Sequence, residues 1–281
     1  MRARTTVYAG ALAVMLVAAC GGRAAPAAAP PSIAAVPASA PTTDPIAVAR
    51  AELAPTGRVR VAVFGPAFVG SKDSTGRVAG VAPQLAQALG ARLGSDVVVD
   101  VYTSPVAALK AQDAWDILFI PSNASPEVAA ALAYTAPLVL IPHSFLVSDP
   151  AIRTVSDLDR ATIRVGTEAG HASQVHAKIP LASVVALDND ESLAQLRAGT
   201  IDAFATGTFA LLDALKGLPT GYRVLDGAFF TATLAIGIGK DRSAGLAWLK
   251  DFVESQRSSG ALQKIVDATG EQSLEVPSAA Y

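Results

Sequence analysis

The segment Trp115–Pro137, WDILFIPSNASPEVAAALAYTAP, decides the fold of this chain. It opens with a short apolar run at 116–120 that has no helical period, and such a run is typical of a parallel strand covered on both faces. Pro121 ends the run, and residues 125–127, SPE, have the pattern of an N-cap, a first-turn proline and an acidic first turn. The segment therefore predicts a buried strand that leads through a polar loop into a helix.

The polar loop after this strand is the first candidate for ligand contact. In an open α/β sheet, ligands lie beyond the carboxyl ends of the strands, where a helix N-terminus offers free N–H groups. Asn123 and Ser125 lie in this loop. The alternative is a polar turn whose serine only caps the helix.

Composition and charge indicate a globular protein. Of the 281 residues, 51% are apolar, which is enough for one large core or two smaller ones. The 22 basic and 24 acidic residues nearly balance and form no basic stripe, so nucleic acid is not an expected partner. We find no Gly-rich phosphate loop and no Ser-His-Asp ordering above chance, and we expect no cofactor.

The N-terminus has the pattern of an export signal at residues 1–19. Arg2 and Arg4 precede an apolar stretch, and the small residues VAA lead into Cys20, the one cysteine of the chain. This arrangement resembles a bacterial lipoprotein signal, in which the cysteine becomes the lipidated first residue. The alternative is an ordinary secretory signal with an incidental cysteine. A single cysteine leaves no disulfide framework and no thiolate metal site.

The next segment, 20–56, is mostly Ala, Pro, Ser and Thr and contains no aromatic residue. It predicts a disordered, semi-stiff tether that holds a folded body away from a membrane. The folded part is expected to begin at Gly57.

From there, strands alternate with helices in two similar sets. The first set has strands at 58–64 and 97–102 around a helix at 81–93, whose apolar residues recur every four positions. The second set runs from 163 to 225, and an apolar stretch at 229–238 is long enough to cross between the sets. This repetition predicts two α/β lobes with mostly parallel sheets.

In this order the chain resembles the family 3 solute-binding proteins, the extracytoplasmic receptors of polar amino-acid ABC importers. Each motif is weak alone, but six occur in the right order and spacing. They are RVRVAV (58–63), GRVAGVAPQLAQALGARLG (76–94), AWDILFIPSNASPEVAAALAYTAPLVL (114–140), TVSDLDRATIRVGTEAGHAS (154–173), ESLAQLRAGTIDAFATG (191–207) and FVESQRSSGALQKIVDATG (252–270).

The resemblance implies an α/β, two-lobe periplasmic binding protein clamshell of type II. Each lobe is then a mostly parallel sheet flanked by helices, and two hinge crossovers join the lobes around a small-molecule solute. The implied boundaries are 57–140 plus 229–270 for lobe 1, 141–228 for lobe 2 and 271–281 for a frayed or surface-draped tail. The resemblance further implies a monomeric, non-enzymatic receptor, lipid-anchored on the periplasmic or cell-surface side, with an ABC permease as partner.

Two departures from the family pattern bear on the ligand. Members that bind α-amino acids have an arginine for the α-carboxylate at the position of Val128, and an acidic residue for the α-ammonium at the position of Gly207. Arginine is absent from 116–150 altogether. An ordinary zwitterionic amino acid is therefore not the expected ligand, because both of its charges would lose a partner.

The remaining candidates for ligand contact are hydrogen-bonding and aromatic residues on the cleft-facing loops. Phe68 is a possible lid, with a surface aromatic packed on its own loop as the alternative. His171 could pair with an anionic group at the start of a helix, and the alternative is a solvated loop imidazole. The full set is Phe64, Phe68, Tyr102, Ser104, Asn123, Ser125, Gly170, His171, Ser173 and Thr206.

Two other classes of function stay open at this point, an enzyme and an accessory protein, while a metal site is not expected. Glu168, His171 and His176 are close in sequence, but a spacing of five does not place both histidines on one helical face, so no metal site is expected. A periplasmic enzyme resembling cyclohexadienyl dehydratase would need a general acid or base, for which Glu168 and His171 are the candidates. An accessory or sensory protein with this fold would act through a protein partner.

We expect Cys20 to anchor the protein to a membrane, because VAAC ends the export signal and an Ala/Pro-rich tract follows it. The substitution Cys20→Ser should move the protein from the membrane fraction to the soluble fraction, measured by immunoblotting of fractionated cells. Unchanged fractionation of the variant would contradict a lipid anchor.

Overall fold

The computed structural model describes residues 44–123 and 125–278. Cys20, the expected signal and most of the expected tether lie outside this range. Among the described residues, no helix is both long and apolar enough to cross a bilayer. The described helices are α1 (Pro45–Leu53), α2 (Val81–Leu93), α3 (Pro105–Lys110), α4 (Pro126–Ala131), α5 (Ala172–Lys178), α6 (Asn189–Ala198), α7 (Thr208–Lys216), α8 (Ser243–Ser258) and α9 (Ala261–Asp267).

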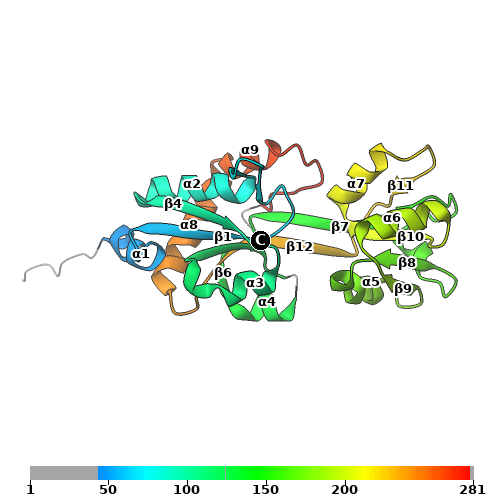
Figure 1. The fold of residues 1–281 in the computed structure, drawn as a ribbon, viewed down its shortest axis with the longest axis horizontal. Coiled ribbons are helices and arrows are strands. Elements are labelled where there is room, and N and C mark those ends of the chain that lie inside the picture. The colour runs from blue at the N-terminus through cyan, green and yellow to red at the C-terminus, as the bar shows by residue number, and fades with distance from the viewer. Residues whose placement is uncertain (1–43, 124, 279–281) are drawn as a thin grey trace, which may run out of the picture. The chain divides into compact units, whose positions relative to one another are not determined.

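One mixed sheet organises these helices, with its main path in the order β4-β1-β5-β12-β7-β10-β8-β9 (Figure 1). A short antiparallel hairpin, β2–β3, lies outside it. The strands are β1 (Arg58–Val63), β2 (Ser71–Lys72), β3 (Val78–Ala79), β4 (Asp96–Val101), β5 (Ile117–Pro121), β6 (Ala133–Tyr134), β7 (Val139–Val147), β8 (Arg164–Thr167), β9 (Ser183–Ala186), β10 (Ala203–Gly207), β11 (Arg223–Val224) and β12 (Phe230–Ile238).

The sheet contains two parallel blocks joined by two antiparallel strands. In the first block β1 pairs in parallel with β4 and β5, and in the second β8 pairs in parallel with β9 and β10. Between the blocks, β12 pairs antiparallel with β5 and β7, and β7 pairs antiparallel with β10. We call the elements around the first block the first lobe, those around the second block the second lobe, and β7 and β12 the crossover strands. The two-lobe α/β class predicted from the sequence is confirmed.

One of the crossover strands runs through a proline. Strand β7 is continuous over Val139–Val147 and includes Pro142. A proline in a strand removes one backbone donor but is tolerated where the lost hydrogen bond is not needed. The apolar stretch at 229–238 forms β12 as expected.

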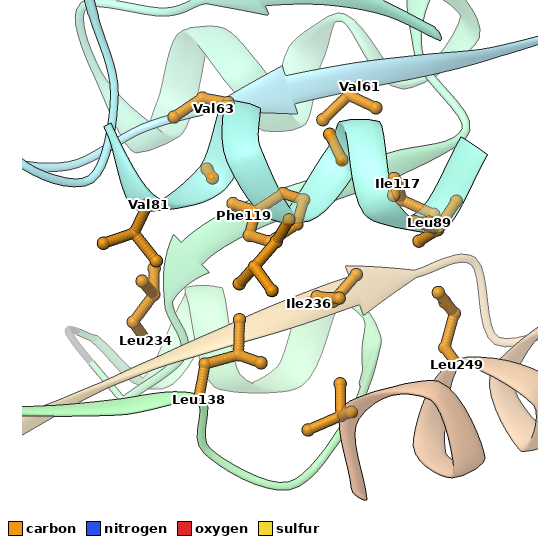
Figure 2. Close-up of a cluster of buried hydrophobic side chains, with 14 of the residues drawn as sticks. Val61, Val63, Val81, Leu89, Ile117, Phe119, Leu138, Leu234, Ile236 and Leu249 are labelled. Atoms are coloured by element: carbon orange, nitrogen blue, oxygen red, sulfur yellow. The ribbon is translucent and has the colours of Figure 1, made fainter. Parts of the chain in front are cut away.

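Each lobe has its own apolar core. In the first lobe, fully buried side chains of β1, β5 and β12 pack against α2 and α8, as Figure 2 shows around Phe119, Leu89 and Leu249. In the second lobe, Phe145 and Val165 belong to a separate buried cluster. The four-residue period of 81–93 therefore marks the core face of α2, and the αL residue Gly94 ends that helix as predicted.

The prediction of a disordered tether over 20–56 is wrong in its last part, because residues 45–53 form helix α1. Asp44 caps the helix through its carboxylate, and Ala49 and Leu53 are buried. Arg50 donates to the carbonyl of Leu93 at the C-terminal end of α2, and Glu52 accepts at 2.6 Å from the amide of Gly245 in the first turn of α8. Helix α1 thus offers a cation to one helix C-terminus and an anion to a helix N-terminus, the arrangement that helix dipoles favour.

The segment after Gly270 is attached rather than frayed. Leu140 and Glu275 exchange two backbone hydrogen bonds, and Leu274 is buried in the first-lobe core. Glu275 is therefore paired with β7, and Leu274 packs into the first-lobe core.

A buried carboxylate ties three elements of the first lobe together. Asp116, at the start of β5, has a fully buried side chain. Its Oδ1 lies 2.8 Å from Arg60 Nη2 and 3.2 Å from Arg242 Nη1, and its Oδ2 accepts from the backbone amide of Arg60. These contacts satisfy a charge that would otherwise be costly to bury.

We expect Asp116→Asn to lower the free energy of unfolding by roughly 3 kcal/mol, because it leaves two guanidinium groups without their shared partner. Urea titration followed by circular dichroism measures this change. Asp213→Asn, which removes an exposed pair with Lys216, is the control and should leave the midpoint where it is. Equal midpoints for the two variants would show that the buried pair does not stabilise the fold.

Candidate functional site

A cavity of about 470 Å³ lies at the carboxyl ends of the parallel strands of both lobes. The loop after β1 contributes Phe64 to Ala67, and the segment after β8 contributes Glu168 and His171. Such a position is where open α/β sheets hold their ligands. The lining is Phe64, Gly65, Pro66, Ala67, Pro121, Ile141, His143, Glu168, His171, Asn189, Thr206, Gly207, Phe209, Phe230 and Ala232.

Two other hollows are larger but less suited to hold a solute. One of about 620 Å³ lies on the surface over hairpin β2–β3, α2 and the edge strand β4. Another of about 580 Å³ lies between the crossover strands, α7 and the residues after Gly270. Neither is lined by an aromatic ring, and we place the site in the cavity at the strand ends.

Strand pairing explains how the crossover strands face the cavity. His143 of β7 is in register with Gly207 of β10 on one side and with Phe230 of β12 on the other. Two residues away, Ile141 is in register with Ala232. Because side chains alternate along a strand, these residues share one face, while Leu140, Pro142 and Ser144 face the hollow behind the strands.

Two imidazole rings meet in the cavity wall. The rings of His143 and His171 lie edge to face with centroids 4.7 Å apart, and Phe230 packs against His143 at 5.3 Å. Nδ1 of His143 is 2.9 Å from the carbonyl oxygen of Ile141. Since a carbonyl can only accept, Nδ1 carries the proton and Nε2 of His143 is a hydrogen-bond acceptor.

Both imidazoles are neutral at pH 7. Burial lowers the pKa of His143 to about 4, and the neighbouring His171 adds to the effect, while the hydrogen bond to Ile141 opposes it. Burial also lowers the pKa of His171, and the nearby carboxylate of Glu168 opposes this shift. Glu168 Oε2 is 3.7 Å from His171 Nδ1, so the two form no hydrogen bond and, with the ring neutral, no ion pair.

Two polar side-chain atoms in the cavity wall have no hydrogen-bond partner among the described residues. Nδ1 of His171 and Oδ1 of Asn189 are both inaccessible to solvent and form no hydrogen bond within the described chain. Asn189 is the first residue of α6, whose N-terminus is already capped by Asp188 and Glu191. Buried polar atoms are normally paired, so these two atoms are exceptions within residues that line the cavity.

The ring of Phe209 occupies the space next to Gly207. A Cβ added to Gly207 would lie 2.3 Å from Cε1 of Phe209. Phe209 in turn packs edge to face on Phe68, with centroids 5.0 Å apart. The wall of the cavity beside Gly207 is therefore formed by the aromatic ring of Phe209.

Three of the residues proposed from the sequence line the cavity, namely Phe64, His171 and Thr206. The other seven lie elsewhere. Phe68 is buried in the first-lobe core against Phe209, and Tyr102 packs on the cluster around Trp115. Gly170 lies in the 3₁₀ turn before α5, and Ser173 is exposed on that helix.

The remaining three form local hydrogen bonds. Ser104 and Ser125 are N-caps that accept from the amides of Ala107 and Val128. The amide of Asn123 donates to the carbonyl of Thr231 at 2.9 Å and accepts from the amide of Thr233 at 2.8 Å, which ties its loop to β12. In the loop after β5, the capping alternative is thus the one observed.

Val128 also turns away from the cavity. Its side chain is buried in the apolar cluster with Trp115 and Leu118. Among the described lining residues there is neither Arg nor Lys. No group of three or more His, Cys, Asp or Glu side chains within the described ranges is placed to hold a metal ion.

Sequence reasoning missed His143, Phe230, Phe209 and Asn189. His143 and Phe230 lie inside apolar runs, and only the register of β7 and β12 brings them together. One signal was available in the sequence: His143 is a polar residue within a long apolar stretch, which needs a reason to be buried.

The fold was compared with known proteins. No model of a known protein family matches the sequence, and no curated protein matches it. Solved structures match over nearly their full length. An ancestral amino-acid-binding protein described as a precursor of cyclohexadienyl dehydratase is 21% identical, with a TM-score of 0.60, and the match covers 77% of this chain and 96% of that one.

Two natural proteins give similar values. A binding component of an ABC transporter from Wolinella succinogenes, solved in complex with lysine, is 21% identical with a TM-score of 0.62, over 75% of this chain and 95% of its own. The L-cystine solute receptor of Neisseria gonorrhoeae is 20% identical with a TM-score of 0.60, over 82% and 98%. The chain therefore has the two-lobe fold of the family 3 solute-binding proteins.

We expect His143 to make the fold sensitive to acid. Its pKa is about 4 in the fold against 6.5 in the unfolded chain, so the unfolded state binds the proton first as pH falls. The contribution of the neutral His143 to the free energy of unfolding is fully present above pH 6.5. As the pH falls from 6.5 to 4, this contribution is lost, and the free energy of unfolding decreases by about 3 kcal/mol. The measurement is urea unfolding at pH 7 and pH 4.5.

The variant His143→Asn keeps a donor for Ile141 but does not titrate, so its stability should depend less on pH. His176→Asn on the exposed face of α5 is the control. A variant at 143 that loses as much stability on acidification as the parent protein would contradict this assignment.

Proposed function

We propose that this protein is an extracytoplasmic solute-binding receptor of an ABC importer. It is exported by residues 1–19, anchored through a lipid on Cys20, and monomeric. The two-lobe fold supports this proposal, since its solved neighbours are binding proteins for small solutes. The observation that carries it is the cavity at the strand ends of both lobes, whose wall includes unpaired polar atoms.

We further propose that the solute has no free carboxylate. The described lining holds no cationic side chain, and both imidazoles are neutral at pH 7. Burying a carboxylate without a cation costs several kcal/mol, and each neutral hydrogen bond returns only about 1 kcal/mol. The rings of Phe64, Phe209 and Phe230 instead offer apolar area, at about 25 cal/mol per Å².

Native mass spectrometry of gently purified protein tests the receptor directly. We expect a small-molecule adduct that is released on unfolding, and we expect the variant Ala232→Trp, which fills the cavity, to lack it. Folded protein that carries no solute and gives no thermal shift with any member of a broad solute library would contradict the receptor.

A calorimetric screen tests the ligand class. We expect no standard amino acid to bind more tightly than about 100 μM, which corresponds to about −5.5 kcal/mol. Low-micromolar binding of an amino acid that is lost in His171→Ala, but kept in the exposed-site control His176→Ala, would overturn the exclusion of carboxylates.

A further inference from the structure

We propose that the cavity selects a cation, namely an amine or amidinium carried on an apolar body about the size of one aromatic ring. This inference rests on the proposed function and names the ligand class of the same site. Three features of the described lining carry it: the roles of its polar atoms, the rings around them and the distribution of charge.

Two side chains of the cavity wall present atoms that can only accept hydrogen bonds. Glu168 presents a carboxylate that no cation of the described chain neutralises, since the adjacent imidazole is neutral. His143 presents Nε2 as an acceptor, because its Nδ1 proton is held by Ile141. A ligand that donates hydrogen bonds would satisfy both, and an amine or amidinium does so with a positive charge.

The aromatic side chains of the lining indicate that the uncharged part of the ligand is apolar. Phe64, Phe209 and Phe230 line the cavity from three different elements, and Ile141 and Ala232 complete an apolar floor from the crossover strands. Aromatic faces attract cations as well as apolar surface. The volume of about 470 Å³ is in the range of pockets that hold small organic ligands.

The charge distribution opposes an anion. Glu168 is the one carboxylate of the described lining, and no Arg or Lys accompanies it. Two features would attract an anion, namely the N-termini of α7 and α5, which begin after Gly207 and His171 without a side-chain cap. The lining therefore contains one full negative charge and two partial positive charges, and the experiment includes an anion to compare them.

Three probes of nearly equal shape separate charge from size: benzamidine as the cation, benzamide as the neutral form and benzoate as the anion. By calorimetry at pH 7, we expect benzamidine to bind at least tenfold more tightly than benzamide, and benzoate to bind more weakly than benzamide. In Glu168→Gln, benzamidine should lose about tenfold in affinity, while benzamide should change less than twofold.

Asp190→Asn is the matched control, because Asp190 is an exposed carboxylate next to Asn189 that does not line the cavity. It should leave the affinity for all three probes unchanged. If benzamidine lost as much affinity in Asp190→Asn as in Glu168→Gln, the effect would be one of general surface charge, and the inference would be wrong.

The outcomes also separate this inference from the proposed function. If benzamide binds as well as benzamidine, or benzoate binds best, the cation inference is wrong and the solute receptor stands. If none of the probes binds although a solute co-purifies, the inference is likewise overturned. If no probe binds and native mass spectrometry finds no solute, the receptor itself fails.

Discussion

The antiparallel pairing of β7 with β12 is the constraint on which the site depends. Each strand is long enough to serve both lobes: β12 pairs with β5 at one end, and β7 pairs with β10 at the other. Because their side chains alternate, one face supplies His143, Phe230, Ile141 and Ala232 to the cavity. A shift of register by one residue would turn all four away, so the chemistry of the site follows from the hydrogen bonds of two strands.

The same pairing explains why the histidines are uncharged. His143 lies in the central position of three adjacent strands and is therefore almost fully buried, and burial of an imidazole disfavours its protonated form. A second imidazole at 4.7 Å can accompany it because neither ring carries a charge at pH 7. Glu168 then has no cationic partner among the described residues, and the cavity presents a single carboxylate beside aromatic rings.

Much of the fold could be predicted because its signals are local. The period of 81–93, the serine cap at 125 and the apolar run at 116–120 each depend on neighbours in sequence. Helix α1 was missed although Asp44 and Pro45 form a local start signal, because the Ala- and Pro-rich composition of the segment favoured a tether. Its contacts with the ends of α2 and α8, made by Arg50 and Glu52, are tertiary and cannot be read from the sequence. Asn123 was assigned to the ligand for a similar reason, since a polar residue after a strand looks the same whether its amide faces a solute or β12.

The two positions that the sequence prediction compared with the family pattern, Val128 and Gly207, have different physical roles in the structure. Val128 joins a buried apolar cluster, so its side chain contributes packing and makes no contact with the cavity. At Gly207 the ring of Phe209 takes the space that a side chain would need, supported from behind by Phe68. An acidic side chain introduced at Gly207 would force Phe209 to move and would expose its packing partner. The wall beside Gly207 is therefore aromatic, and it favours a ligand with an apolar body over one that needs a carboxylate at this position.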